Sequence, residues 1–356
     1  MTALHSSTWT APHPARSWRA PAPGSNPAEF HRSLPGYRPS PLVEAPGLAV
    51  ELAVGRVLVK DESDRFGLPA FKILGASWAI ESALSGGAGD VTTLVAATDG
   101  NHGRAVAWVA AQRGLAARIF VPAGVHPAAV AAIEAEGATV TTVEDSYDAA
   151  VAAAIADVER TGGLLVQDTA WPGYEQLPAW IVEGYRTMFV EIDEQLGATP
   201  LDLLVVPVGV GSLAQAAIGH YRRPGIGHPP ALLSVEPDGA ACALQSLQQD
   251  ELVSVATAPS IMTGLCCETP SAAAWPYLRQ GLDAAVAVSD AEAAAAVGDL
   301  AAAGVPSGPC GAATLAAARL VLADPDLRRS LGVDEESTVV LLSTESSTAN
   351  PSASAP

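Results

Sequence analysis

Lysine is scarce in this chain of 356 residues, in which only Lys60 and Lys72 accompany 17 arginines. Arginine stays protonated under all ordinary conditions, whereas a desolvated lysine can lose its proton and attack a carbonyl to form a Schiff base. Lys72 opens a predicted helix in the apolar segment AFKILGASWAI, residues 70–80. This setting favours a chemical role, although a surface lysine whose aliphatic stem covers the core gives the same pattern. Lys60 stands beside Asp61 and Glu62, where we expect local pairing.

Positive charge as a whole is scarce, because 19 basic residues stand against 38 acidic ones and the formal net charge is −19. A chain this acidic repels nucleic acids and anionic membranes. No apolar run is long enough to span a bilayer, and the N-terminal residues contain no apolar core of a secretory signal. We therefore expect neither a nucleic-acid partner nor a membrane partner.

Cysteine is limited to Cys242, Cys266, Cys267 and Cys310. None of the pairs has C-x-x-C spacing, and no histidine stands at a metal-ligand spacing from them, so we predict no metal site. Cys266 and Cys267 are adjacent and would pair only with strain. We expect four reduced thiols in a cytoplasmic protein.

Short apolar, β-branched segments alternate with alanine-rich segments along most of the chain. The first kind predicts strands at 56–60, 93–98, 118–122, 139–144, 164–168, 203–208, 232–237 and 337–344. The second kind predicts helices at 102–113, 127–137, 146–161, 178–196, 212–221, 290–303 and 311–323. This order predicts the α/β class, with two mainly parallel open sheets around a shared cleft.

The same pattern predicts how the chain divides into domains. Residues 29–75 and 175–345 are expected to form a large domain that binds the ligand, and residues 76–174 a small one. Residues 1–28 and 346–356 are rich in alanine, proline and serine, so we expect them to be disordered.

Polar and glycine-rich segments follow the predicted strands, at the strand ends where ligands bind in such folds. Lys72 follows the first strand after a turn, Asn101 lies in DGNHG after the second, and Asp168 follows LLVQ. GVGSLAQA, residues 209–216, turns from a strand into a helix, and Ser343 ends the last strand. A glycine-rich turn at a helix N-terminus binds phosphate. Together with a Schiff-base lysine, an amide for a phenolic oxygen and a hydroxyl for a ring nitrogen, it meets the requirements of pyridoxal 5'-phosphate.

Seven segments carry a resemblance to a known family. They are HRSLPGYRPSPL, VLVKDESDRFGLPAFKILGASWAI, ATDGNHGRAVAW, VQDTAWPGYEQLPAWIVEGY, VGVGSLAQA, IMTGLCCETPS and LLSTE, in this order from about residue 30 to residue 345. The chain resembles the fold type II pyridoxal phosphate enzymes, the group of serine/threonine dehydratases and tryptophan synthase β, and in particular the diaminopropionate ammonia-lyases. The resemblance implies a Schiff base on Lys72, a cofactor-ring contact by Asn101, Ser343 near the ring nitrogen, Asp99 and Asp168 as acid/base carboxylates, and a phosphate loop of Gly209, Val210, Gly211, Ser212 and Leu213.

Two departures from the family pattern concern the substrate more than the cofactor. GPCG, with Pro309 and Cys310, stands where the resembled lyases have a turn like GESG, and Glu345 is not followed by the usual glycine. The resemblance implies α,β-elimination of 2,3-diaminopropionate to pyruvate and ammonia by an ammonia-lyase that acts as a homodimer on a small amino acid. A serine/threonine dehydratase and a β-replacement synthase of the same fold remain alternatives.

Other interpretations of single motifs remain open. GVGSLA also matches the dinucleotide fingerprint G-x-G-x-x-A, with Glu236 near the expected acidic position, which is typical of a nicotinamide-dependent dehydrogenase. That interpretation leaves the lysine, the amide and the hydroxyl without a shared purpose. Asp99 before Gly100 is also ordinary turn chemistry, and Asp168 is also a typical helix cap. For His102, next to Asn101, we predict no role in the site.

Overall fold

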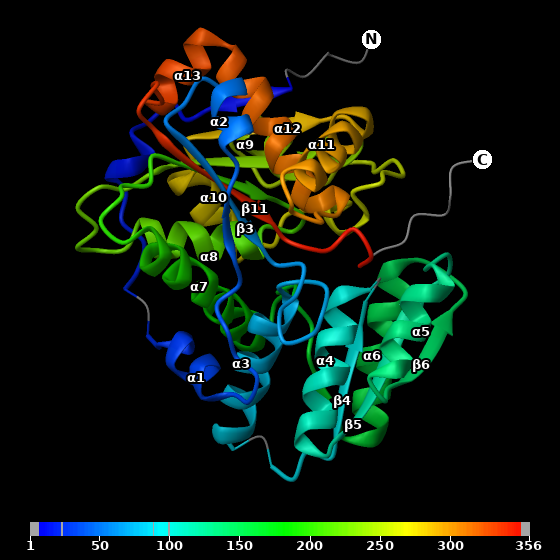
Figure 1. Ribbon diagram of the computed structural model, residues 1–356. Helices are drawn as coiled ribbons and strands as arrows, with labels where there is room; N and C mark the ends of the chain where they lie inside the picture. The colour runs from blue at the N-terminus through cyan, green and yellow to red at the C-terminus, as the bar shows by residue number, and fades with distance from the viewer. Residues whose placement is uncertain (1–6, 23, 88, 99, 350–356) are drawn as a thin grey trace.

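The computed structural model describes residues 7–22, 24–87, 89–98 and 100–349, and it contains two sheets (Figure 1). The larger sheet has the order β1-β10-β9-β8-β11-β3-β2. Its strands are β1 (Thr8–Thr10), β2 (Leu42–Glu44), β3 (Arg56–Asp61), β8 (Leu203–Pro207), β9 (Ala231–Pro237), β10 (Ala284–Val288) and β11 (Thr338–Ser343). Its five central strands are parallel and the edge strands β1 and β2 are antiparallel to their neighbours. The central strands are buried along almost their whole length, which explains their continuous apolar sequences.

The smaller sheet is wholly parallel, with the order β6-β5-β4-β7. Its strands are β4 (Thr93–Ala97), β5 (Ala116–Pro122), β6 (Thr139–Val143) and β7 (Leu164–Leu165). They come from one continuous part of the chain, and Figure 1 shows them with α4, α5 and α6 apart from the larger sheet.

Helices cover both sheets. They are α1 (Pro27–Ser33), α2 (Pro46–Glu51), α3 (Lys72–Ser85), α4 (Asn101–Arg113), α5 (Pro127–Ala135), α6 (Tyr147–Thr161), α7 (Gln176–Leu196), α8 (Ser212–Tyr221), α9 (Cys242–Gln249), α10 (Trp275–Gly281), α11 (Asp290–Ala302), α12 (Pro309–Ala323) and α13 (Pro325–Leu331). Helix α12 packs on four strands of the larger sheet, whereas α4 and α6 pack on the smaller one. In the part of the chain that the structure describes, no helix is long and apolar enough to cross a membrane.

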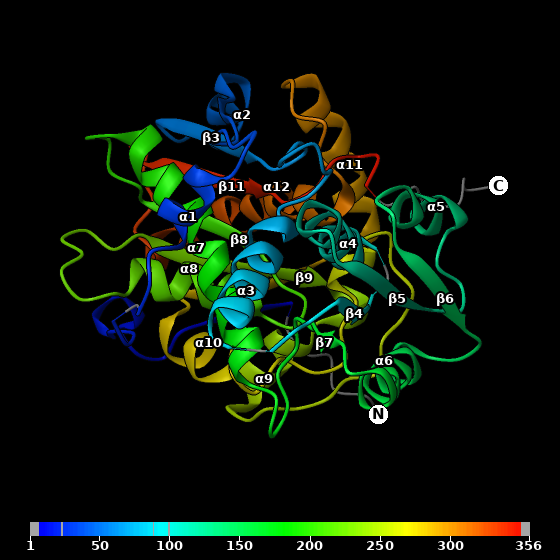
Figure 2. The ribbon, with the colours of Figure 1, turned by 90° about the horizontal axis from the view of Figure 1, so that it is seen from below.

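Helices α3 and α7 cross in close contact, and Figure 2 shows them side by side. Two glycines allow this approach. A Cβ atom on Gly184 would lie 2.3 Å from the carbonyl oxygen of Leu74, and one on Gly75 would lie 2.5 Å from the ring of Tyr185. Because packed interiors tolerate no such overlap, the crossing fixes the first turn of α3, which begins with Lys72, relative to α7.

The α/β class with mainly parallel sheets is confirmed, and all eight predicted strands are present. The strands β1, β2 and β10 were not predicted, because two of them have three residues each and β10 is the alanine-rich segment AAVAV.

The expected disorder of residues 1–28 is wrong where the structure describes them. Strand β1 pairs with β10, Arg16 forms an ion pair with Asp283, and Trp9 and Trp18 pack against the core. Aromatic anchors and backbone pairing therefore order a segment whose overall composition is that of a flexible tail. Of the C-terminal segment, Ser346 forms a bridge with Ser307, and residues 350–356 lie outside the described part.

Candidate functional site

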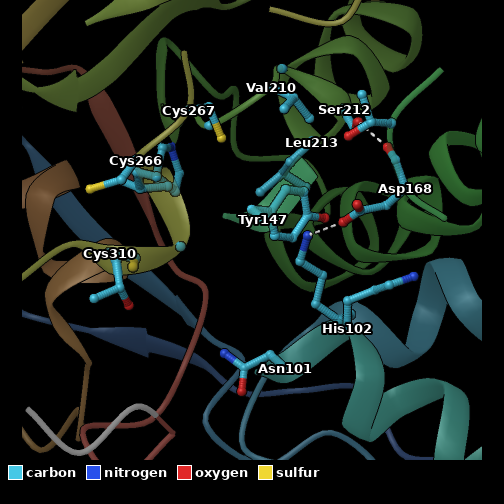
Figure 3. Close-up of a pocket in the computed structure, with 18 of the residues that line it drawn as sticks. Asn101, His102, Tyr147, Asp168, Val210, Ser212, Leu213, Cys266, Cys267 and Cys310 are labelled. Carbon is cyan, nitrogen blue, oxygen red and sulfur yellow. Dashed lines mark hydrogen bonds and ion pairs between the residues drawn. The ribbon is translucent and has the colours of Figure 1, made fainter. Parts of the chain in front are cut away.

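A cavity of about 620 Å³ lies where strand ends of both sheets meet, and Figure 3 shows the residues that line it. One wall comes from the starts of α3, α4 and α6 and from the segment after β7. The opposite wall comes from the turn between β8 and α8, the segment around residues 263–269, the start of α12 and the end of β11. The larger sheet thus supplies a glycine-rich turn, and the segments around the smaller sheet supply polar side chains.

Lys72 is the first residue of α3, and its amine projects into the cavity. Its Nζ lies 2.8 Å from Oδ2 of Asp168, and the dashed line at the side chain of Asp168 in Figure 3 marks this contact. Burial acts to raise the pKa of Asp168, but the charge of Lys72, with a smaller effect of His102, holds that pKa well below its usual range. Lysine and carboxylate therefore form an ion pair inside the cavity.

Lys60 has a different environment, since its side chain is fully buried. Its Nζ donates to Oε2 of Glu191 at 2.7 Å, to the carbonyl oxygen of Ser40 and to Oε1 of Gln195. Arg65 binds the same carboxylate. The expectation that Lys60 pairs locally is wrong. Its partner Glu191 belongs to α7 and lies more than a hundred residues away in the sequence.

The glycine-rich turn Gly209, Val210, Gly211, Ser212 and Leu213 lines the cavity along its whole length and leads into α8. Gly211 has φ +100°, a conformation that favours glycine, and a Cβ atom on Gly209 would lie 3.0 Å from the carbonyl oxygen of Gly264. The hydroxyl of Ser212 donates to the backbone oxygen of Asp168 at 3.2 Å. The turn thus forms a backbone cradle at a helix N-terminus, joined to the segment that carries the carboxylate.

Asn101 begins α4 and lies across the cavity from Ser212 in Figure 3. Its amide nitrogen donates to Oε2 of Glu345 at 2.9 Å. Ser343 is fully buried behind the wall, which Thr344 and Glu345 form at this point. The Ser343 hydroxyl has no hydrogen-bond partner among the residues that the structure describes. The structure thus brings Lys72, Asp168, Asn101 and the turn together and leaves Ser343 just outside the lining.

Three other residues from the sequence analysis have distinct outcomes. Asp99 lies outside the described residues. His102 lines the cavity, and its ring is engaged by the backbone, since its Nε2 lies 2.8 Å from the carbonyl oxygen of Val166. Cys310, from the departing turn GPCG, is the second residue of α12 and also lines the cavity.

The sequence reasoning missed three aromatic residues of the cavity wall, Tyr147, Trp171 and Tyr185. The hydroxyl of Tyr147 accepts a hydrogen bond from Gln167 at 2.6 Å. Trp171 and Tyr185 lie in the quoted segment VQDTAWPGYEQLPAWIVEGY, so a search of that segment for aromatic side chains offered a signal. Tyr147 begins α6 without a comparable motif.

Glu236 does not support the dehydrogenase interpretation. It is fully buried, and its two carboxylate oxygens accept the backbone N–H groups of Ala243 and Leu244 at 2.8 and 2.7 Å. Burial raises the pKa of Glu236 to about 8, although these hydrogen bonds act to lower it. A carboxylate enclosed in this way at the start of α9 is not available to a ribose hydroxyl.

The residues present fit pyridoxal phosphate. Two close-packed glycines leave room for a phosphate at the N-terminus of α8, and the Lys72 amine reaches the same cavity. The buried hydroxyl of Ser343 has no hydrogen-bond partner among the described residues and lies directly behind the lining residue Thr344, which is consistent with a polar group of a bound ligand nearby.

Comparison with known proteins assigns the class. Residues 33–345 match the family model of pyridoxal-phosphate dependent enzymes, so the chain belongs to that family, has its fold type II architecture and depends on pyridoxal phosphate. Within the family it belongs with the diaminopropionate ammonia-lyases. It is 37% identical over 291 residues to the diaminopropionate ammonia-lyase of Salmonella typhimurium, a match that covers 74% of this chain and 72% of that protein.

Solved structures of the Escherichia coli diaminopropionate ammonia-lyase are also similar. The complex with D-serine has a TM-score of 0.83 at 33% identity, and the match covers 90% of this chain and 87% of that chain. The complex with an aminoacrylate–PLP azomethine reaction intermediate has a TM-score of 0.81 at 33% identity over the same shares.

Proposed function

We propose that this protein is a diaminopropionate ammonia-lyase that converts 2,3-diaminopropionate into pyruvate and two molecules of ammonia by α,β-elimination. The observation that carries the proposal is the Lys72–Asp168 ion pair, 2.8 Å long, in a cavity that also contains the glycine-rich turn. The similarity to diaminopropionate ammonia-lyases along most of the chain supports the choice of substrate.

Binding of the cofactor is assigned to residues from both sides of the cavity. The backbone of residues 209–213 would hold the phosphate, Lys72 would supply the amine for the Schiff base, Asn101 would contact the ring, and Ser343 would serve the ring nitrogen. When bound, pyridoxal phosphate withdraws electrons from the substrate and makes its Cα proton acidic. The hydrogen bond of Asn101 to Glu345 orients the amide toward the cavity, which supports its assignment.

Proton transfer is assigned to Lys72, Asp168 and Asp99. The amine of Lys72 removes the Cα proton on one face of the substrate, and Asp99 removes it on the other. The Cβ–N bond then breaks, and its electron pair leaves with ammonia, which needs a proton because an amide ion is a very poor leaving group. Water replaces the second amino group and supplies the ketone oxygen of pyruvate.

Asp168 is suited to supply that proton, because its pKa depends on the charge of Lys72. While Lys72 is charged, the pKa of Asp168 is held low against the effect of burial. When the lysine is neutral, the effect of burial remains and raises the proton affinity of the carboxylate. A buried carboxylate coupled to the lysine thus takes up and releases a proton as the lysine changes its charge.

The proposal also covers the domains, the oligomeric state and the location of the protein. We infer that residues 76–174 form the small domain, since the smaller sheet lies within them, and that residues 29–75 and 175–345 form the large one. The homodimer rests on the family resemblance, and the cytoplasmic location rests on the expectation of reduced cysteines. Light scattering of the purified protein distinguishes the mass of one chain from that of two.

The test of the cofactor site uses the scarcity of lysine. The purified protein is reduced with borohydride and digested, and the modified peptide is identified by mass. We expect a yellow protein and a cofactor adduct on Lys72, with Lys60 as the unmodified internal control. A colourless protein, or an adduct elsewhere, contradicts the site.

The test of the reaction is stoichiometric. Pyruvate and ammonia are measured with 2,3-diaminopropionate, serine and threonine, each supplied alone. Two ammonia per pyruvate from diaminopropionate, at a much higher kcat/KM than serine or threonine gives, supports the lyase. Preference for serine or threonine makes the protein a dehydratase, and the turn with Pro309 and Cys310 is then the first place to examine. Product formation only with an added thiol or amine makes it a β-replacement synthase.

A further inference from the structure

Tyr185 is a buried tyrosine of the cofactor cavity whose hydroxyl makes no hydrogen bond of standard geometry to any described residue, although Lys72 lies near enough to act on it. Its side chain is fully buried, so bulk water does not satisfy the hydroxyl. Buried polar groups are nearly always paired, and an exception at a ligand cavity calls for an explanation. In this cavity, the nearest candidate partner is the amine of Lys72, which acts on the phenol.

The ring of Tyr185 is held firmly in place. It contacts the ring of Phe71 at a centroid distance of 4.8 Å. On another side it fills the space that the missing side chain of Gly75 leaves at the crossing of α3 and α7. Phe71 and Gly75 flank Lys72 in sequence, so the phenol is fixed against the same helical turn that carries the reactive amine.

Lys72 and Asp168 are the charged groups that act on the phenol. Burial raises the pKa of Tyr185 above its ordinary value. The charge of Lys72 opposes this increase, Asp168 adds to it, and a weaker hydrogen-bond interaction with Lys72 also opposes it. Tyr185 therefore remains a neutral hydroxyl at working pH. The titratable groups that act on the pair are Tyr185 from α7, His102 from α4 and the ion-pair partners themselves.

We propose that Tyr185 is a positioning residue whose hydroxyl oxygen accepts a hydrogen bond from the Lys72 ammonium and so makes the amine a stronger base. When the neutral amine of Lys72 removes the Cα proton, it becomes an ammonium group, and the electron pair of the broken C–H bond stays on the substrate. An acceptor fixed beside the amine stabilises that product, because a hydrogen bond to a charged group is stronger than one to a neutral group. This inference rests on the proposed role of Lys72 as the base.

The first test uses the cofactor-free full-length protein, labelled with lysine that carries ¹³C at Cε. Its spectrum contains two lysine side-chain signals, and the one absent from Lys72→Ala belongs to Lys72. In Tyr185→Phe, which keeps the ring and removes the hydroxyl, we expect the Lys72 titration to move to lower pH by about one pH unit, the effect of one hydrogen bond to a charged group. The Lys60 signal reports whether the fold is intact.

Tyr221→Phe is the matched control. Tyr221 is also buried, and its hydroxyl also makes no hydrogen bond of standard geometry to a described residue, but it lies on α8 outside the cavity lining. The control should leave the Lys72 titration unchanged. If Tyr221→Phe moves it as far as Tyr185→Phe does, or if neither variant moves it, the inference is wrong.

The second test measures turnover by the holoenzyme. For Tyr185→Phe we expect kcat to fall by about 10- to 100-fold with KM nearly unchanged, because the lost interaction forms only as the proton is transferred. An increase in KM alone, or an unchanged kcat, overturns the inference. These outcomes differ from failure of the proposed function, in which the wild-type protein forms no adduct on Lys72 at all.

Discussion

The two lysines of this chain lie twelve residues apart and have opposite environments. Lys60 is enclosed in a cluster with Glu191 and Arg65, where each buried charge meets an opposite charge and hydrogen bonds. Lys72 faces a cavity and pairs with Asp168, while the neighbouring hydroxyl of Tyr185 makes no hydrogen bond of standard geometry to a described residue. Burial alone therefore does not distinguish a reactive lysine. The distinguishing feature is that Lys72 faces a cavity lined by polar groups that a ligand can reach, whereas Lys60 does not.

The strongest test of this comparison is Lys72→Ala. We expect loss of the Schiff base and a fall in turnover of more than about 10⁴-fold, because the variant lacks the only amine in the cavity lining. Absorbance and steady-state kinetics provide the measurements. Turnover near that of the wild type would move the chemistry to another residue.

Asp168→Asn tests the partner of the reactive lysine. The variant keeps the shape and hydrogen-bonding capacity of the side chain but loses its negative charge. We expect a yellow, folded protein whose kcat is reduced by about 10²–10⁴-fold, the usual contribution of general acid–base catalysis.

Asp99→Asn is expected to produce a loss of this size on at least one enantiomer of the substrate. Unchanged rates on both enantiomers would remove that residue from the mechanism.

Lys60→Met tests the enclosed lysine by removing one member of its cluster. It leaves Glu191 with one cation fewer in a fully buried position, and breaking a buried pair costs about 3–5 kcal/mol of unfolding free energy. Thermal or urea unfolding should show this loss, while kcat per folded molecule remains near the wild-type value. A selective loss of kcat without a loss of stability would make the two lysines more alike than the structure indicates.

Glu236→Gln sharpens the comparison with a buried carboxyl group whose partners are amides instead of cations. Glu191 has a lowered pKa despite burial because Arg65 and Lys60 surround it, whereas burial raises the pKa of Glu236 to about 8. The folded protein therefore holds a proton on Glu236 that the unfolded chain releases above pH 4.5. The resulting stabilisation is complete below that pH and is lost as the pH rises through 8.

The measurement is the melting temperature between pH 5 and 9. In the wild type, the free energy of unfolding and with it the melting temperature should decrease as the pH rises. We expect this loss of unfolding free energy to be smaller in Glu236→Gln by on the order of a few kcal/mol, since one pKa unit corresponds to about 1.4 kcal/mol. The exposed Glu335→Gln is the control and should keep the wild-type slope. Equal slopes in all three proteins would show that Glu236 is ionised in the folded state.

Sequence reasoning reached the parts of the site that depend on local pattern. Lys72, Asn101, Asp168 and the turn at 209–213 follow strands in the sequence, and parallel strands bring their ends to one edge. Tyr185 was not reached, because its position depends on the crossing of α3 and α7, which two separate glycines permit. The partner of Lys60 was missed for the same reason, since Glu191 belongs to α7. Contacts between distant segments leave little trace in local periodicity.

Strand β1 has a consequence for handling this protein. It pairs with β10, which without it would be the outermost strand of the larger sheet. An uncovered strand presents a row of unpaired backbone groups to which another chain can add. The three residues of β1 therefore cover the edge of β10, although they belong to a segment rich in proline and alanine. A truncation that removes residues 8–10 would expose this edge and increase the tendency of the protein to self-associate.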